Sequence, residues 1–100
     1  MKKKEYINNI EKFYKANIDI SKKKMNDYTG DNPFDNFLLA SMTGATVEQG
    51  LLIRIGDKFS RACNLIGKGT KQQVSDESVV DTLADMANYC AILATYLKSK

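Results

Sequence analysis

Three acidic side chains recur at helical spacing near the end of the chain. Glu77, Asp81 and Asp85, here called the acidic stripe, follow one another every four residues, with Asn88 on the same side and Tyr89 beside it. Residues four apart share one face of a helix, where like charges repel, so a run of three carboxylates needs a reason. Carboxylate oxygens suit Mg²⁺, which often bridges a protein to substrate phosphates. The spacing therefore makes Glu77, Asp81 and Asp85 candidate Mg²⁺ ligands.

A second group of side chains carries the opposite charge. Arg54, Lys58 and Arg61 lie close together on the polar side of another predicted helix, and Asn64 follows them. Such cations can bind phosphate directly, because the arginine guanidinium offers two parallel hydrogen bonds to an anion. They can equally form salt bridges with the acidic stripe across a helix pair. The residue types alone leave both interpretations open beside the metal site.

A third cluster combines amides and aromatic rings around a turn. It follows the lysine run that ends at Lys24 and contains Tyr28, Asn32, Phe34 and Asn36. Aromatic rings can stack on a nucleobase, and Asn can hydrogen-bond to the edge of a base. The alternative is a capped turn that places Phe34 and Phe37 in the core, with the lysines on a solvated helix face.

The elements that must position these groups are helices. Apolar residues recur at intervals of three and four over residues 3–27, 33–42, 47–66 and 76–97, and no strand pattern competes with them. The expected caps are Asn32 with Pro33 at the first helical position, Thr46 with Gln49 as a capping box, and Ser75. The chain is predicted to be all-α. Residues 1–100 should form a single domain, a small helical bundle of three long helices plus one short helix, with antiparallel neighbours.

Each predicted helix has an apolar face that is expected to form the core. These faces comprise Ile7, Ile10, Tyr14, Ile18 and Met25; Phe34, Phe37 and Leu38; Leu51, Leu52, Ile55, Phe59, Ala62, Cys63 and Ile66; and Val79, Val80, Leu83, Met86, Ala87, Cys90, Leu93, Ala94 and Leu97. Both cysteines are therefore expected to be buried thiols in a reducing compartment. Gly50 and Gly56 interrupt the third helix and would permit a close backbone approach by another helix or a ligand.

The composition excludes several classes of function. The chain has 100 residues, a net charge of +3 and no histidine. Without histidine or a CxxC pair, a zinc site and Ser/His or Cys/His catalysis are excluded. The positive charge is too small and too dispersed to indicate nucleic-acid binding. No signal peptide or apolar run of membrane-spanning length occurs, so we expect a cytoplasmic protein without a membrane partner. A chain this short would gain stability by forming a homo-oligomer.

The motifs resemble a known family. The run Asp-Glu-Ser-Val-Val-Asp-Thr-Leu-Ala-Asp-Met-Ala-Asn-Tyr over residues 76–89, together with Asn32-Pro33-Phe34 and Asp57-Lys58, looks like the phage and bacterial "nucleotide modification associated" small-domain family. The resemblance extends over residues 27–96. It implies an all-α protein that handles nucleotides. That family in turn resembles, more distantly, the MazG-like all-α nucleotide pyrophosphohydrolases, which oligomerise and bind Mg²⁺ through carboxylates on two helices.

This sequence departs from the MazG-like pattern in one respect. It has Arg54, Lys58 and Arg61 where those enzymes have paired carboxylates, and cations suit an anion better than a metal. The lead prediction is therefore non-catalytic binding of a small phosphorylated nucleotide without a cofactor, in a phage protein that sequesters a host nucleotide immune signal in the bacterial cytoplasm. The alternatives are a Mg²⁺-dependent MazG-like pyrophosphohydrolase and a structural helical subunit with no small ligand.

Overall fold

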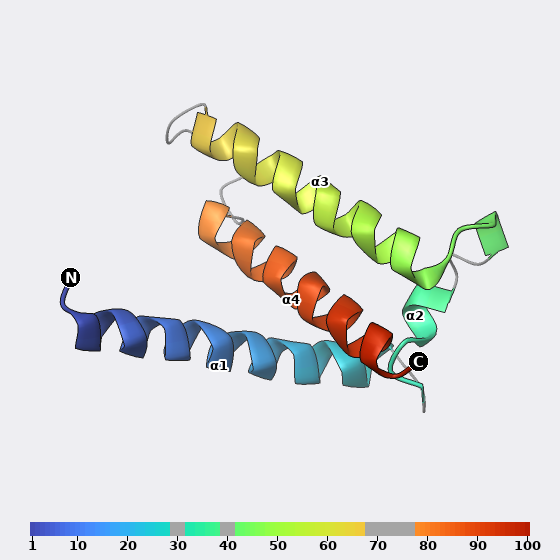
Figure 1. The fold of residues 1–100 in the computed structure, drawn as a ribbon, viewed down its shortest axis with the longest axis horizontal. Coiled ribbons are helices and arrows are strands. Elements are labelled where there is room, and N and C mark those ends of the chain that lie inside the picture. The colour runs from blue at the N-terminus through green and yellow to red at the C-terminus, as the bar shows by residue number, and fades with distance from the viewer. Residues whose placement is uncertain (29–31, 39–41, 68–77) are drawn as a thin grey trace. The chain divides into compact units, whose positions relative to one another are not determined.

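The regular secondary structure of the described residues is helical. The computed structural model describes residues 1–28, 32–38, 42–67 and 78–100. Its helices are α1 (Lys3–Tyr28), α2 (Asp35–Leu38), α3 (Val47–Gly67) and α4 (Val79–Lys98), as Figure 1 shows. No strand occurs among these residues, which confirms the all-α class. Within the same ranges, no helix is both long enough and apolar enough to cross a lipid bilayer.

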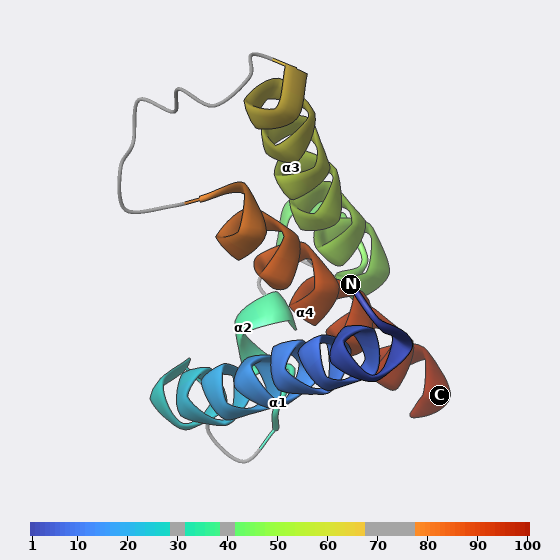
Figure 2. The ribbon, with the colours of Figure 1, turned by 90° about the vertical axis from the view of Figure 1, so that its left-hand side faces the viewer.

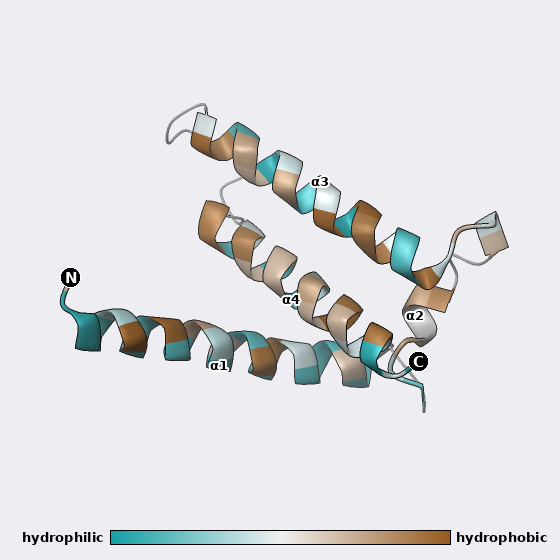
Figure 3. Ribbon diagram, viewed as in Figure 1, coloured by the Kyte–Doolittle hydropathy of each residue, from teal (hydrophilic) through white to brown (hydrophobic). Residues whose placement is uncertain are grey.

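The chain divides into two compact units, Met1–Asp35 and Asn36–Lys100. This division neither confirms nor contradicts the prediction that residues 1–100 form a single domain. The first unit contains one long helix, α1, along which apolar and polar residues alternate (Figure 3). A lone helix cannot bury its own apolar stripe. The expected core residues Ile7, Tyr14 and Ile18 are accordingly exposed, so their assignment to a core is wrong for this unit.

In the second unit, α3 and α4 pack against each other as an antiparallel pair (Figures 1 and 2). The direction follows from their contacts, because Arg61 meets Thr82 whereas Lys58, one turn earlier on α3, meets Asp85, one turn later on α4. This confirms the predicted antiparallel arrangement of these neighbours. Leu51 and Thr82 are completely buried between the helices, and Val47 and Ala62 are nearly so.

The side of α4 that packs against α3 is not the one expected from its apolar pattern. Val80, Leu83 and Leu97 are exposed, whereas the polar Thr82 is fully buried. Apolar residues of α4 therefore lie on exposed sides of the helix as well as on its buried side. The side of α4 that packs on α3 is the one from which Thr82 meets Arg61 and Asp85 meets Lys58.

The outer sides of both helices carry side chains that were expected in the core. On α3, Leu52, Phe59 and Ile66 are exposed, although Leu51 and Ala62 are buried as predicted. Cys63 and Cys90 are free and exposed, so the prediction of buried thiols is wrong. Both cysteines lie on helix sides that the pairing of α3 with α4 leaves uncovered.

The capping box predicted for α3 is confirmed. The Gln49 amide donates to Thr46 Oγ1 at 3.1 Å, and the Thr46 amide donates to Gln49 Oε1 at 2.9 Å. The corresponding prediction for α4 is wrong, because Ser78 caps this helix with an extended backbone at φ −78° and ψ 167°. The Asp81 amide donates to Ser78 Oγ at 3.0 Å, and the Ser78 amide donates to the Asp81 carboxylate at 3.1 Å. This reciprocal pair makes Val79 the first helical residue and excludes a start at Asp76.

The predicted start of α2 is also wrong. The helix begins at Asp35 and not at Pro33. The Phe34 amide donates to Asn32 Oδ1 at 2.9 Å, which is the kind of bond expected from Asn32 as a cap. Residues 39–41, which include part of the predicted helix over residues 33–42, lie outside the described ranges.

Candidate functional site

Three cations of α3 lie on the side of this helix that turns towards α4. Arg54, Lys58 and Arg61 fall within about 60° of the helix circumference, since successive residues are rotated by about 100°. The side chains therefore form a row along the helix pair, as their spacing predicted. Each one has a different kind of partner on a neighbouring element.

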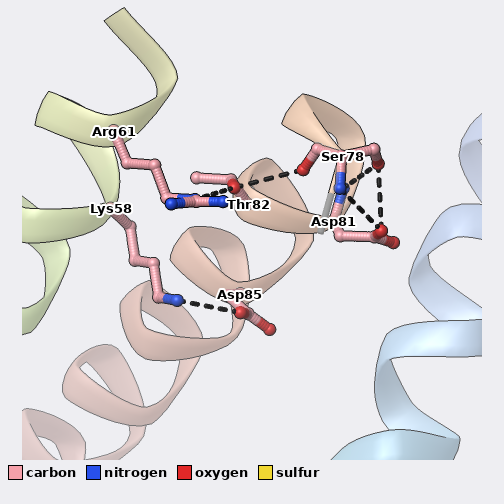
Figure 4. A network of polar contacts seen from close by, with 6 residues as sticks. All are labelled: Lys58, Arg61, Ser78, Asp81, Thr82 and Asp85. Carbon is pink, nitrogen blue, oxygen red and sulfur yellow. Dashed lines mark hydrogen bonds and ion pairs between the residues drawn. The ribbon is translucent and has the colours of Figure 1, made fainter. Parts of the chain in front are cut away.

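Arg61 is held by a buried hydroxyl. Its Nε–H donates to Thr82 Oγ1 at 3.3 Å, and the Thr82 hydroxyl in turn donates to the Ser78 carbonyl at 3.1 Å (Figure 4). Thr82 has no exposed surface, so its oxygen is a fixed acceptor within the helix pair. The Ser78 cap and Arg61 are thereby joined through one side chain.

Lys58 forms an ion pair with the acidic stripe. Its Nζ lies 3.1 Å from the Asp85 carboxylate (Figure 4), and the two side chains are 25% and 32% exposed. The sequence interpretation that stripe and cations form a salt bridge across the helices is confirmed for this pair. An ion pair this accessible to water contributes roughly 0–1 kcal/mol to stability, so the contact fixes geometry more than it holds the fold.

Arg54 has aromatic partners. Its guanidinium carbon lies 5.3 Å from the centre of the Phe37 ring and 5.7 Å from the centre of the Tyr89 ring. Both distances are within the range of a cation–π interaction. In the part of the chain that is described, no carboxylate forms an ion pair with Arg54. The positive charge of Arg54 is therefore not neutralised by a carboxylate of these residues.

The three cations line an open groove. Its volume is about 330 Å³, and its walls are formed by Arg54, Asp57, Lys58, Arg61 and Tyr89. This volume lies near the lower end of the usual range for small-ligand sites. Among the residues that line it, Arg54, Lys58 and Arg61 carry positive charge and Asp57 carries negative charge. It offers guanidinium donors for an anion and one aromatic ring.

Two other predicted site residues lie on the same helix pair without lining the groove. Asn64 is exposed on α3, and Asn88 is half-buried on α4. Asp81 belongs to the cap of α4, where its carboxylate accepts from both the amide and the hydroxyl of Ser78. Two members of the acidic stripe therefore have separate partners.

The third member of the stripe, Glu77, lies outside the described residues. The proposed Mg²⁺ site of Glu77, Asp81 and Asp85 thus remains a prediction. Across the described ranges, no group of three carboxylate or thiol side chains is arranged to hold a metal.

The predicted cluster around the turn belongs mostly to the first unit. Lys24 is exposed on α1, Asn32 caps the turn, and Phe34 is half-buried. The side chains of Tyr28 and Asn36 lie outside what the structure describes. The prediction that these five residues bind a nucleotide remains a prediction.

Sequence reasoning did not identify three residues that matter in the groove. The sequence predicts Asp57 only as part of a motif and as an ion-pair partner of Arg61 within the helix, predicts Phe37 only as a core residue, and gives no role to Thr82. Phe37 is indeed buried, with 8% of its surface exposed, but its ring also contacts Arg54. The sequence contains no signal for the Arg61–Thr82 contact, because that contact depends on the register between α3 and α4.

A scan of protein-family models and searches of curated proteins and of solved structures found no match to this chain.

Proposed function

We propose that this protein binds a small phosphorylated nucleotide in the groove between α3 and α4 and releases it chemically unchanged. The observation that carries the proposal is Arg54, a guanidinium that lines the groove and has aromatic rings as its contacts. A guanidinium presents donors in a geometry that matches phosphate oxygens.

The other groove residues support the same assignment. Lys58 and Arg61 add positive charge, and both are held in place by contacts with α4. The Tyr89 ring provides an aromatic surface at the wall of the groove, where a base or sugar could pack. The groove offers electrostatic attraction and stacking, which are the means of binding a nucleotide. We place no catalytic residue in it.

The proposal includes a biological setting that follows from the family resemblance. A phage-encoded protein of this kind would sequester a nucleotide immune signal in the cytoplasm of its bacterial host, and would act as a homo-oligomer. The exposed apolar side chains of α3, including Leu52, Phe59 and Ile66, support self-association, because a second copy could cover them.

A thermal-shift experiment tests the binding. The protein is incubated with linear and cyclic nucleotides, with and without Mg²⁺, and the ligand is then recovered and analysed by chromatography. A ligand that binds the folded state raises the melting temperature. We expect a Mg²⁺-independent shift with the ligand recovered intact. Recovery of a cleaved product that requires Mg²⁺ would instead support the pyrophosphohydrolase.

Two variants locate the site. Arg54→Ala should abolish the shift, because it removes a groove cation that has no ion-pair partner among the described residues. Lys98→Ala removes an exposed lysine from the last turn of α4 and serves as the matched control, which should respond like the wild type. An equal ligand response in the two variants would place the site elsewhere.

A structural role is the second candidate, and the Lys58–Asp85 ion pair favours it. In that case the charged side chains align α3 with α4 and bind no small ligand. No nucleotide would then shift the melting temperature, and Lys58→Ala would lower the stability of the protein or of its assembly.

A further inference from the structure

Two rings converge on Arg54 from different elements. Phe37 lies in α2, Arg54 in α3 and Tyr89 in α4, so the guanidinium contacts rings from two other helices of the unit Asn36–Lys100. Phe37 is buried and Tyr89 is half-buried, whereas the Arg54 side chain is exposed. The rings are therefore the fixed partners in these contacts, and the long arginine side chain is the part that they restrain.

We propose that Phe37 and Tyr89 are positioning residues, which hold the Arg54 guanidinium in its anion-binding orientation before any ligand arrives. This inference rests on the proposed function. It gives Phe37, which would otherwise be only a core residue, a role in binding. Where an aromatic ring contacts the face of a guanidinium, the N–H donors at the edge stay available for phosphate oxygens.

The physical benefit is a smaller loss of side-chain freedom on binding. An arginine that moves freely in solution must be ordered when it grips an anion, and this cost lowers the affinity. Arg61 and Lys58 are already restrained by Thr82 and Asp85. With Arg54 held by rings, all three cations of the groove are ordered before the ligand binds.

The test uses inorganic pyrophosphate and ADP as probes, with dissociation constants measured by calorimetry on the full chain. Pyrophosphate has no base, so any effect of a ring on its binding must act through the cations. Replacing Tyr89 by Leu should weaken binding of both probes by roughly two- to tenfold, the cost of ordering one side chain. The Tyr89→Phe variant keeps the ring and should bind both probes like the wild type.

Tyr96→Leu is the matched control. It removes a half-buried ring two turns further along α4, and this ring contacts Lys100, which does not line the groove. We expect wild-type affinity for both probes. If Tyr89→Leu does not fold, Phe37→Leu removes the other ring and should weaken binding of both probes in the same way.

A spectroscopic readout tests positioning without any ligand. In the unliganded wild type, the Arg54 Nε–H resonance should be displaced by the ring currents of Phe37 and Tyr89. The displacement should persist in Tyr89→Phe and shrink in Tyr89→Leu. A purely structural role for Tyr89 at another contact would leave this resonance unchanged.

Three results would overturn the inference. If Tyr89→Leu weakens ADP binding but not pyrophosphate binding, the ring stacks on the base and does not act through Arg54. If the same variant binds pyrophosphate more tightly, the rings compete with the anion for the guanidinium. If the wild type binds neither probe nor any nucleotide of the panel, the proposed function fails together with the inference.

Discussion

Thr82 offers the sharpest test of how α3 and α4 recognise each other. It is a fully buried polar residue whose hydroxyl oxygen accepts from Arg61 Nε at 3.3 Å. Thr82→Val keeps the branched shape and removes the hydroxyl. The Ser78 carbonyl loses one donor but keeps the Thr82 amide at 3.0 Å, and the bond from Arg61 is lost.

The magnitude follows from this geometry. A hydrogen bond to a charged group contributes about 1.5–3 kcal/mol, but 3.3 Å is long for such a bond, so we expect a loss of about 1–2 kcal/mol. For a domain of this size, that loss lowers the melting temperature by roughly 5–15 °C. The assay is urea unfolding followed by circular dichroism, with the slope compared to confirm that only stability has changed.

A double-mutant cycle assigns the loss to the contact. Thr82→Val should cost about 1–2 kcal/mol in the wild type and much less in an Arg61→Met background, where the bond is already absent. Thr82→Ser keeps the hydroxyl and loses one methyl group, so it should cost the same in both backgrounds. If Thr82→Val costs the same with and without Arg61, the contact does not stabilise the helix pair and the reasoning is wrong.

Three further predictions concern α3 and the cap of α4. Gly56→Ala should stabilise the protein by roughly 0.5–1 kcal/mol, because alanine favours the helix and a Cβ at this position would meet no atom within 4 Å; thermal unfolding measures it. Ser78→Ala should cost about 1 kcal/mol in urea unfolding, because it removes the side-chain acceptor of the α4 cap. The hydrogen bond from Lys100 to Glu48, at 2.7 Å, lowers the pKa of Glu48 and raises the pKa of Lys100. A lowered carboxyl pKa stabilises the fold above the ordinary value of 4.5 and loses this effect as the pH falls through the folded value. A raised lysine pKa stabilises it below 10.5 and loses the effect as the pH rises through the folded value. The stability difference between the wild type and Glu48→Gln, measured by thermal unfolding, should therefore be present at neutral pH and disappear towards both extremes.

For each of these three predictions, one outcome would contradict the reasoning. A loss of stability or of assembly in Gly56→Ala would mean that another chain or a ligand approaches this helix side closely, as the glycine itself would permit. Ser78→Thr should retain most of the cap, so equal losses in the Ala and Thr variants would contradict the capping role. A difference between the wild type and Glu48→Gln that stays constant from pH 3 to pH 7 would show that the ion pair is not its source.

Local signals in the sequence sufficed to predict the helices and part of the site. Thr46 and Gln49 act within one turn of backbone, and their capping box was predictable because it needs no tertiary contact. The same reasoning could have found the cap at Ser78, since Asp81 follows at the required spacing. The row of Arg54, Lys58 and Arg61 was equally predictable, because helical geometry alone places these residues on one side.

The partners of these cations depend on tertiary structure. The register of α4 against α3 pairs Lys58 with Asp85 and Arg61 with Thr82, and no local pattern encodes a register. The ring contacts of Arg54 require α2, α3 and α4 together, which is why Phe37 was assigned only to the core.

The acidic stripe shows most clearly what the sequence determines and what only the tertiary structure decides. Its four-residue spacing is a property of the sequence, and it correctly placed the carboxylates on one side of a helix. Their partners are set by where each carboxylate falls along the helix: Asp81 lies in the first turn and caps it, whereas Asp85 lies one turn later and reaches Lys58. The sequence alone therefore determined which charges share a side of α4. The register between α3 and α4 decided which of them meet a partner across the helix pair, because such a contact depends on both helices at once.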